Sequence, residues 1–272
     1  MQSFFIRIKH ILFVSMDGNI VVFDSGVGGL STLRELVRLL PCEDFVYFAD
    51  NANAPYGTKS ADEVTVCAAA CADRYFLLQP KAVMLACNTA TSICIGGLRK
   101  KYQQAIFVGM RPAIKPAMTE RAKKVAVFTT LATAQSAGFN EFAAVFKSAD
   151  LTVVPLIEGA ELVESGCGEE RFFNYLCEQL SGVNADDFSG VVLGCTHFVL
   201  VKAAFEKFFP AAKIYDGNSG AAAAAKKMLG DAGKLRENGR QGEISFVLTR
   251  DNESEREKYL RIFNACKQLS RV

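Results

Sequence analysis

Short runs of apolar residues recur along the chain, and most of them lead into a polar or glycine-rich segment and then a helical pattern. Such runs are typical of buried strands and are too short for isolated helices. We predict strands at residues 20–23, 45–48, 82–86, 106–109, 125–128, 151–157, 191–193, 213–216 and 244–248. Helical spacing covers residues 30–40 and an alanine-rich stretch at 58–78, among others. Strands that alternate with helices indicate an α/β fold with largely parallel sheets.

Two of the predicted strands lead into a cysteine, and the segments around these cysteines are similar. Val-Met-Leu-Ala-Cys87-Asn-Thr aligns with Val-Val-Leu-Gly-Cys195-Thr-His, an offset of 108 residues between positions 87 and 195. The segments 20–25 and 125–130 repeat with an offset of 105, from position 23 to 128. A nearly constant offset predicts two similar α/β domains related by pseudo-twofold symmetry. If the two domains face each other, the two thiols face each other across a cleft.

Cys87 is predicted to lie at the carboxyl end of a strand, the edge of an α/β sheet where ligands bind. It follows a buried strand and precedes Asn88 and Thr89, residue types that begin helices. Ligands bind at this edge of an open α/β sheet, and a helix N-terminus lowers the pKa of a thiol. One such cysteine could equally be a buried packing residue. The matching position of Cys195 favours a functional pair.

The segment Asp24-Ser-Gly-Val-Gly-Gly29 connects the first strand to the first helix. Its glycines allow close approach of the backbone to an anion at the helix start. They are not in the GxGxxG order, and no Lys-Ser/Thr pair follows, so a small carboxylate fits this loop better than a nucleotide. We expect Asp24 to meet an ammonium group or a thiol, with a helix N-cap as the alternative.

Two further polar segments follow strands at the same predicted edge. The loop at 49–57 ends in Pro-Tyr56-Gly57, which can direct N–H groups and a phenol into the cleft or form a packed turn. Glu158 follows the strand at 151–157 and places a carboxylate at the edge of the second domain. Glu161 and Glu164 continue on a helix and are expected to face water.

Composition excludes several classes of protein. The net charge of +2 and the absence of a basic run give no footprint for nucleic acid. The chain has nine cysteines without a CxxC pair, which indicates free thiols in a reducing, cytoplasmic setting. No apolar stretch approaches the length of a membrane span. The apolar and basic residues 1–15 lack the unbroken core of a signal peptide, and we expect them to lie outside the core fold.

Several reactions could use the two cysteines. A Cys–His hydrolase would need only one thiol, and a zinc site at Cys87, Cys195 and His197 lacks the close-spaced pairs typical of zinc ligands. A redox disulfide is a further alternative. Two opposed thiols suit inversion of a stereocentre without a cofactor, because one removes a proton from carbon while the other delivers one to the opposite face. Hydrogen bonds in a closed, dry cleft would have to stabilise the carbanion.

Four segments in order resemble the motifs of bacterial glutamate racemases, which belong to the cofactor-independent amino-acid racemases. They are Asp24-Ser-Gly-Val-Gly-Gly-Leu30, Pro55-Tyr-Gly57, Ala86-Cys-Asn-Thr-Ala90 and Gly194-Cys-Thr-His197. The resemblance implies that Cys87 and Cys195 are the acid/base pair and that Asp24, His197 and Glu158 assist them. The positions that match substrate-binding residues are Asp24, Ser25, Tyr56, Gly57, Asn88, Thr89, Thr196 and His197.

The resemblance also implies a substrate, a setting and an assembly. The substrate would be L- or D-glutamate, with D-glutamate supplied for peptidoglycan in the cytoplasm, without cofactor or metal, by a homodimer. Asn51, Asn53, Arg111 and Val199 depart from the family pattern. A related racemase or decarboxylase acting on aspartate or another acid, and a non-catalytic binding protein, remain as alternatives. We predict a first domain at 17–112 plus 218–272, a second at 113–217, and an extension at 1–16.

Overall fold

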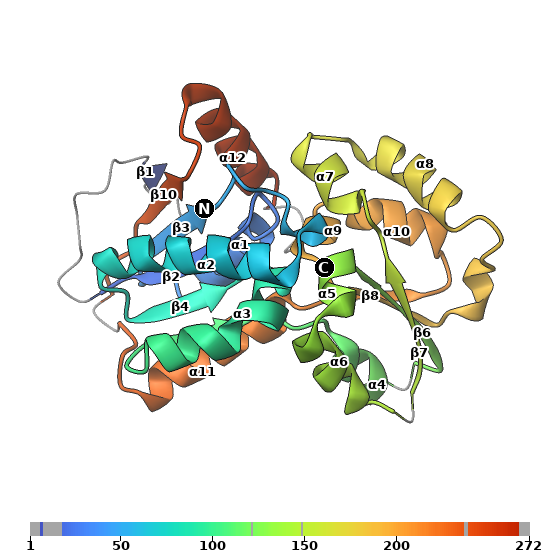
Figure 1. The fold of residues 1–272 in the computed structure, drawn as a ribbon, viewed down its shortest axis with the longest axis horizontal. Coiled ribbons are helices and arrows are strands. Elements are labelled where there is room, and N and C mark those ends of the chain that lie inside the picture. Colours follow the sequence, from blue (N-terminus) through green and yellow to red (C-terminus); the bar gives the residue numbers. More distant parts are fainter. Residues whose placement is uncertain (1–5, 8–17, 121, 148, 237–238, 267–272) are drawn as a thin grey trace.

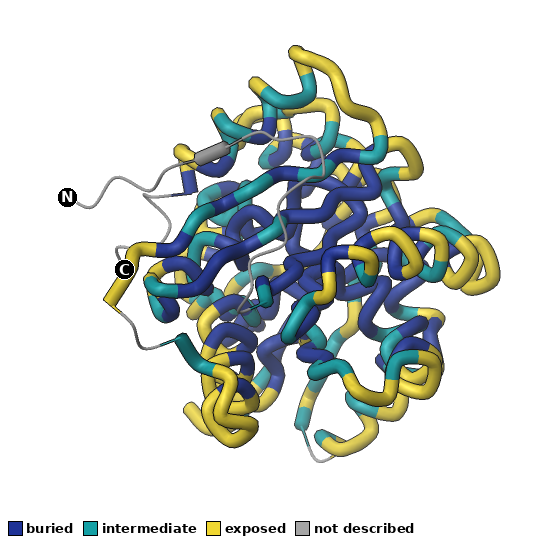
Figure 2. Tube along the Cα trace, turned by 90° about the vertical axis from the view of Figure 1, so that its left-hand side faces the viewer, coloured by how far each residue is buried: buried dark blue, intermediate teal, exposed yellow. Residues whose placement is uncertain are grey.

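The computed structural model describes residues 6–7, 18–120, 122–147, 149–236 and 239–266. These residues form two lobes, each built on a parallel β-sheet that helices cover (Figure 1). Figure 2 shows that buried residues follow the strands through the centre, whereas exposed residues gather on outer loops and helix turns. The predicted α/β fold with two parallel sheets is confirmed.

The first lobe contains a six-stranded sheet in which every neighbouring pair is parallel. Its strands, in spatial order, are β1 (Ile6–Arg7), β10 (Ile244–Leu248), β3 (Phe45–Ala49), β2 (Ile20–Asp24), β4 (Ala82–Leu85) and β5 (Ile106–Gly109). Successive side chains of a strand point to opposite faces of a sheet. Val21 and Phe23 accordingly pack with α2 (Ala61–Tyr75) and α3 (Asn88–Lys101). Their neighbours in β2 pack with the helices of the other face, which are α1 (Leu30–Leu39), α11 (Asn218–Asp231) and α12 (Glu253–Ala265).

The second lobe contains a four-stranded parallel sheet. Its strands, in spatial order, are β7 (Asp150–Pro155), β6 (Lys124–Thr129), β8 (Gly190–Leu193) and β9 (Lys213–Asp216). Its helices are α4 (Ile114–Thr119), α5 (Leu131–Gln135), α6 (Ala137–Ala144), α7 (Gly159–Glu164), α8 (Glu169–Gln179), α9 (Thr196–Val199) and α10 (Lys202–Phe208), with a short 3-10 turn η3 (Ala185–Asp187). Helices α5, α7 and α9 lie where the two lobes meet (Figure 1).

The two sheets repeat one strand order. Numbered along each lobe, β3-β2-β4-β5 and β7-β6-β8-β9 both run second, first, third, fourth. The register repeats as well, because Phe23 pairs with Leu85 in the first sheet and Phe128 pairs with Leu193 in the second. These partners reproduce the offsets of 105 and 108 residues found in the sequence. The internal similarity therefore reflects a repeated structural unit that places Cys87 and Cys195 at equivalent positions.

The two ends of the chain add strands to the first sheet. Strand β10 pairs with β3, and the two residues of β1 pair with Ile244 and Ser245 of β10. The expectation that residues 1–15 lie outside the core fold is therefore wrong for Ile6 and Arg7, which belong to the first sheet. The rest of the predicted extension at 1–16 lies outside the described residues. The domain boundaries themselves remain a prediction.

The stretch at 58–78, predicted as one helix, is divided into three pieces. A 3-10 turn, η1 (Tyr56–Thr58), precedes α2, and a second one, η2 (Phe76–Leu78), follows it. The start of α2 is fixed by a capping box, in which the Ser60 side chain accepts from the Glu63 N–H and the Glu63 carboxylate accepts from the Ser60 N–H. The helix cannot extend back through Thr58 because Ser60 has an extended backbone.

Candidate active site

Cys87 lies two residues after β4 and forms the N-cap of α3. Its sulfur accepts from the Ala90 N–H at 3.5 Å and lies 3.6 Å from Ser25 Oγ. The residue is only 5% exposed. Burial and the negative charge of Asp24 raise the pKa of the thiol to about 12, against the weaker opposing effect of its two hydrogen bonds. This raised pKa favours the protonated form of the Cys87 thiol at neutral pH.

Cys195 occupies the equivalent position after β8, at the N-cap of α9, and is also 5% exposed. Its sulfur lies 3.7 Å from His197 Nδ1. The two thiols interact across the lobe boundary, because charge on Cys195 contributes to the raised pKa of Cys87. Each lobe therefore carries one buried thiol at the equivalent position, and each thiol has different polar neighbours.

Asp24 ends β2 and is fully buried between the lobes. One carboxylate oxygen accepts from the Gly26 N–H at 2.9 Å, and the other accepts from Thr196 Oγ1 of the second lobe at 3.1 Å. Burial raises its pKa to about 6, although the charge of His197 and both hydrogen bonds act in the opposite direction. The carboxyl group can therefore change its charge near neutral pH, beside a thiol that responds to that charge.

His197 is paired with a carboxylate that the sequence did not indicate. Its Nε2 lies 2.6 Å from Glu164 Oε1, and both side chains are largely buried. Burial lowers the pKa of the imidazole, but the hydrogen bonds and charges of Cys195 and Glu164 raise it well above its ordinary value of 6.5. The imidazole lies between a carboxylate and a thiol, and its raised pKa favours the imidazolium form.

The expectation that Glu164 faces water is wrong. Glu164 is the last residue of α7, four residues after the buried Ala160, so the helix turns its carboxylate towards the same packed side. Glu158, which the resemblance placed beside Cys195, is exposed at the N-cap of the same helix and makes no capping hydrogen bond with its side chain. The geometry therefore brings Glu164, and not Glu158, to His197.

Three further predicted residues, Tyr56, Gly57 and Asn88, are buried or tightly packed. Tyr56 donates to Asp50 Oδ2 at 2.6 Å, and burial raises its pKa far above the ordinary value. Gly57 packs directly on Thr130 of the second lobe, where an added Cβ would lie 2.8 Å from Thr130 Cγ2. Asn88 is buried as the first residue of α3. The Tyr56 hydroxyl is thus used to hold its own loop.

Hydroxyl groups of both lobes meet in a second contact across the boundary. Thr89 Oγ1 lies 3.0 Å from both Thr130 Oγ1 and Thr133 Oγ1. The sequence showed a hydroxyl-rich loop after the strand at 125–128 but gave no reason to bring it to Thr89. Together with the Asp24–Thr196 hydrogen bond, this contact links the two lobes.

The described part of the chain bears on the metal and disulfide alternatives. Within those residues, no three His, Cys, Asp or Glu side chains are arranged to hold a metal ion. All nine cysteines are free thiols. None of the helices in the described ranges has both the length and the apolar character needed to cross a membrane.

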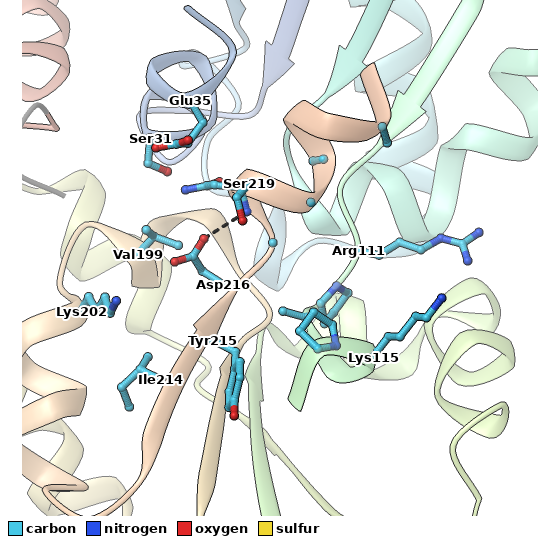
Figure 3. Close-up of a pocket in the computed structure, with 18 of the residues that line it drawn as sticks. Ser31, Glu35, Arg111, Lys115, Val199, Lys202, Ile214, Tyr215, Asp216 and Ser219 are labelled. Atoms are coloured by element: carbon cyan, nitrogen blue, oxygen red, sulfur yellow. Dashed lines mark hydrogen bonds between the residues drawn. The ribbon is translucent and has the colours of Figure 1, made fainter. Parts of the chain in front are cut away.

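A cavity of about 810 Å³ lies elsewhere between the lobes, lined by α1, the segment from β5 to α4, and the turn from β9 to α11. Figure 3 shows the Arg111 and Lys115 side chains on one side of it. Two positions that depart from the family pattern, Arg111 and Val199, line this cavity. Neither Cys87 nor Cys195 is among its lining residues, so these departures lie apart from the thiols.

Comparison with known proteins covers both lobes. The family model described as Asp/Glu/Hydantoin racemase matches residues 20–225. A glutamate racemase of Clostridium novyi (strain NT) is 39% identical over 237 residues, which cover 86% of this chain and 92% of the relative. A glutamate racemase of Halothermothrix orenii is 39% identical over 248 residues, covering 89% and 97% of the two chains.

Solved structures give the same result for the fold. Glutamate racemase from Francisella tularensis in complex with D-glutamate superposes with a TM-score of 0.80 at 25% identity, over 92% of this chain and 95% of that one. The RacE1 isoform of glutamate racemase from Bacillus anthracis superposes with a TM-score of 0.82 at 25% identity, over 91% and 94%. The region matched by the family model includes every predicted site residue.

Proposed function

The chain belongs to the Asp/Glu/hydantoin racemase family, and we propose that it is a glutamate racemase that interconverts L-glutamate and D-glutamate. One observation carries the mechanism: Cys87 and Cys195 come from equivalent positions of the two lobes and have different proton-handling neighbours. The names of the relatives support glutamate as the substrate.

In one direction, the Cys195 thiolate removes the α-proton and the Cys87 thiol delivers its proton to the opposite face of the α-carbon. The raised pKa of Cys87 supports its role as the donor in this direction. The His197 ring nitrogen Nδ1, 3.7 Å from the Cys195 sulfur, supports Cys195 as the base in this direction. The proton taken from one face is matched by one delivered to the other, so the amino acid is inverted without net proton change.

In the reverse direction, Cys87 must become the base, and the substrate itself can allow this. We place the substrate ammonium group against Asp24, whose buried charge raises the pKa of Cys87. Neutralising that charge lowers the pKa of Cys87 and makes its thiolate accessible. Asp24 then both binds the ammonium group and controls the pKa of Cys87.

The α-carboxylate must be held so that negative charge can develop at the α-carbon. Asn88 and Thr89, at the N-terminus of α3, are the proposed contacts of this carboxylate, together with Ser25 and Thr196. A 14-residue helix presents free N–H groups and a positive dipole end at that position. In a closed site that excludes water, such fixed dipoles are stronger than in solution.

The resemblance to bacterial glutamate racemases supports a biological role. We propose a cytoplasmic, cofactor-independent enzyme that supplies D-glutamate for peptidoglycan, with Cys87, Cys195, Asp24 and His197 as catalytic residues. Homodimerisation and a catalytic contribution of Glu158 remain expectations from the family.

The test is proton NMR of L-glutamate and of D-glutamate in D2O with the enzyme. We expect the α-proton signal of both enantiomers to disappear, with inversion detected by chiral chromatography. Exchange with aspartate but not with glutamate would retain the two-thiol mechanism and change the substrate. No exchange with any amino acid would contradict the proposed function.

A further inference from the structure

The carboxylate of Glu164 is shared between the two lobes. It belongs to α7 of the second lobe, yet its Oε1 accepts from the Val27 N–H of the first lobe at 2.8 Å while it contacts His197. Its Oε2 lies 3.9 Å from Lys258 Nζ of α12, also in the first lobe. The loop after β2 was predicted to bind a small carboxylate, and the carboxylate found there is the protein's own Glu164.

The glycines of this loop are required by that contact. A Cβ at Gly26 would lie 1.6 Å from Glu164 Oε1, and a Cβ at Gly28 would lie 2.7 Å from His197 Nδ1. Only a backbone without side chains at these two positions lets the second lobe approach the Val27 N–H. The loop is therefore shaped to receive the Glu164–His197 pair when the lobes are together.

The two contacts from the first lobe stabilise the ionised form of Glu164 beside His197. Burying a carboxylate beside an imidazolium favours proton transfer within the pair, which would leave both groups neutral. A main-chain N–H and an ammonium group oppose this transfer, because both stabilise the charged carboxylate. Burial raises the pKa of Glu164, but His197, the Val27 N–H and Lys258 together bring it below its ordinary value.

We propose that the first lobe sets the proton chemistry of Cys195 through Glu164. When the lobes close, Val27 N–H and Lys258 keep Glu164 ionised. Glu164 in turn keeps His197 as an imidazolium against Cys195. Lys258 and Glu164 are positioning residues in this scheme, which rests on the proposed function only for the reaction that it serves.

Other ionisable groups around Glu164 do not replace Lys258. The buried Asp24 carboxylate on β2 repels Glu164. Burial raises the pKa of Tyr47 on β3 and of Tyr259 on α12, and charge on Glu164 adds to this effect. Lys258 is also 2.9 Å from Glu255, which fixes the ammonium group near the lobe boundary. Among the described residues, Lys258 is therefore the first-lobe cation that pairs with Glu164.

The histidine itself provides the direct test. The chain has two histidines, so a His10→Gln background leaves His197 as the only source of imidazole signals. We expect ¹⁵N NMR of the full-length protein to show His197 doubly protonated at pH 7.5, and Lys258→Met and Glu164→Gln to shift its titration to lower pH. An unshifted titration in both variants, or a neutral His197 in the unsubstituted background, would overturn the proposal.

Kinetics provide the second readout. Lys258→Met should lower kcat by about threefold to tenfold with little change in KM, the size expected for one partly exposed ion pair. Lys258→Arg should restore kcat and the pH profile. Lys227→Met, which removes an exposed helical ion pair with Asp231, is the matched control and should have no effect.

The two readouts separate this inference from the proposed function. The titration of His197 does not depend on which amino acid is turned over. If glutamate is not a substrate but His197 responds to Lys258, the electrostatic scheme stands and the proposed substrate fails. If glutamate is racemised and the Lys258 variants match the control in both readouts, the scheme fails alone.

Discussion

The surroundings of Cys87 and Cys195 differ although the structural units that carry them are alike. Both cysteines follow the third strand of a lobe in the same register and form the N-cap of the next helix. Cys87 has a hydroxyl and a buried carboxylate for neighbours, whereas Cys195 has an imidazolium. The repeat supplies one thiol from each lobe, and the differing neighbours give the two thiols different electrostatic surroundings.

Replacing each thiol separately should give the largest effect. Cys87→Ser and Cys195→Ser should each lower the rate of full inversion by at least about 10³-fold, since a serine hydroxyl is a far weaker acid and base at this position. Exchange of the α-proton in D2O should then survive for at most one enantiomer in each variant, and for opposite enantiomers in the two. If both variants affected the two enantiomers equally, the thiols would not be distinct.

Asp24→Asn should stabilise the protein while impairing the reaction. The pKa of Asp24 is about 6 in the folded chain against 3.8 ordinarily, so the folded state binds more protons between these values and loses stability as the pH rises through them. The cost at pH 7.5 is about 3 kcal/mol at roughly 1.4 kcal/mol per pKa unit. Urea unfolding should show a gain approaching this size at pH 7.5.

The same variant has an internal control in pH. Below the ordinary pKa of 3.8 the wild-type carboxyl is protonated in both the folded and the unfolded state. The stability advantage of the Asp24→Asn variant over the wild-type protein should therefore fade as the pH approaches 4. A gain that is independent of pH would show that burial of the charge is not its cause.

Gly28→Ala should impair closure of the lobes. The new Cβ would lie 2.5 Å from Thr196 Oγ1 and 2.8 Å from the main-chain nitrogen of His197, so the second lobe has to move. Overpacking of this kind costs about 1–3 kcal/mol. We expect loss of activity with a free energy of unfolding that falls by this amount, measured by urea titration. Unchanged activity would mean that the lobes do not meet here during the reaction.

Gly96→Ala should have the smallest effect and the opposite sign. Gly96 lies within α3 in the first lobe, with nothing within 4 Å of an added Cβ. Alanine in an exposed helix interior is favoured over glycine by about 0.5–1 kcal/mol. A rise in the free energy of unfolding with unchanged kcat would show that the sensitivity of Gly28 comes from its place between the lobes. A fall in kcat would contradict the view that only glycines between the lobes are sensitive to an added Cβ.

The sequence was sufficient for the features that repeat and for those that lie within one segment. Apolar runs gave all nine predicted strands to within a few residues, and the cysteine offset gave the paired thiols. Contacts between distant segments were not accessible. Glu164 meets Val27 across 137 residues, whereas from its own helix we expected its side chain to face water.

Contacts with a distant segment also determine the surroundings of Tyr56 and Asn51. The sequence left open whether the Tyr56 phenol points into the cleft or belongs to a packed turn. In the structure Asp50 accepts the Tyr56 hydrogen bond, and the other Asp50 oxygen accepts from Thr249. Asn51 departs from the family pattern, and its amide pairs with both the N–H and the carbonyl of Arg250. Both partners belong to the segment after β10, which no local pattern near residue 50 could reveal.

The position of β10 has a consequence for how the protein matures during synthesis. Its neighbour β3 is complete early in translation, yet Thr249, which follows β10 and bonds to Asp50, is made 199 residues later, after the whole second lobe. Until then β3 lacks its β10 partner, and the loop carrying Tyr56 lacks the Thr249 contact. On the ribosome, the first lobe to emerge is therefore the last to be completed, and the loop that carries Tyr56 gains its Thr249 contact only when β10 and the segment after it have been released.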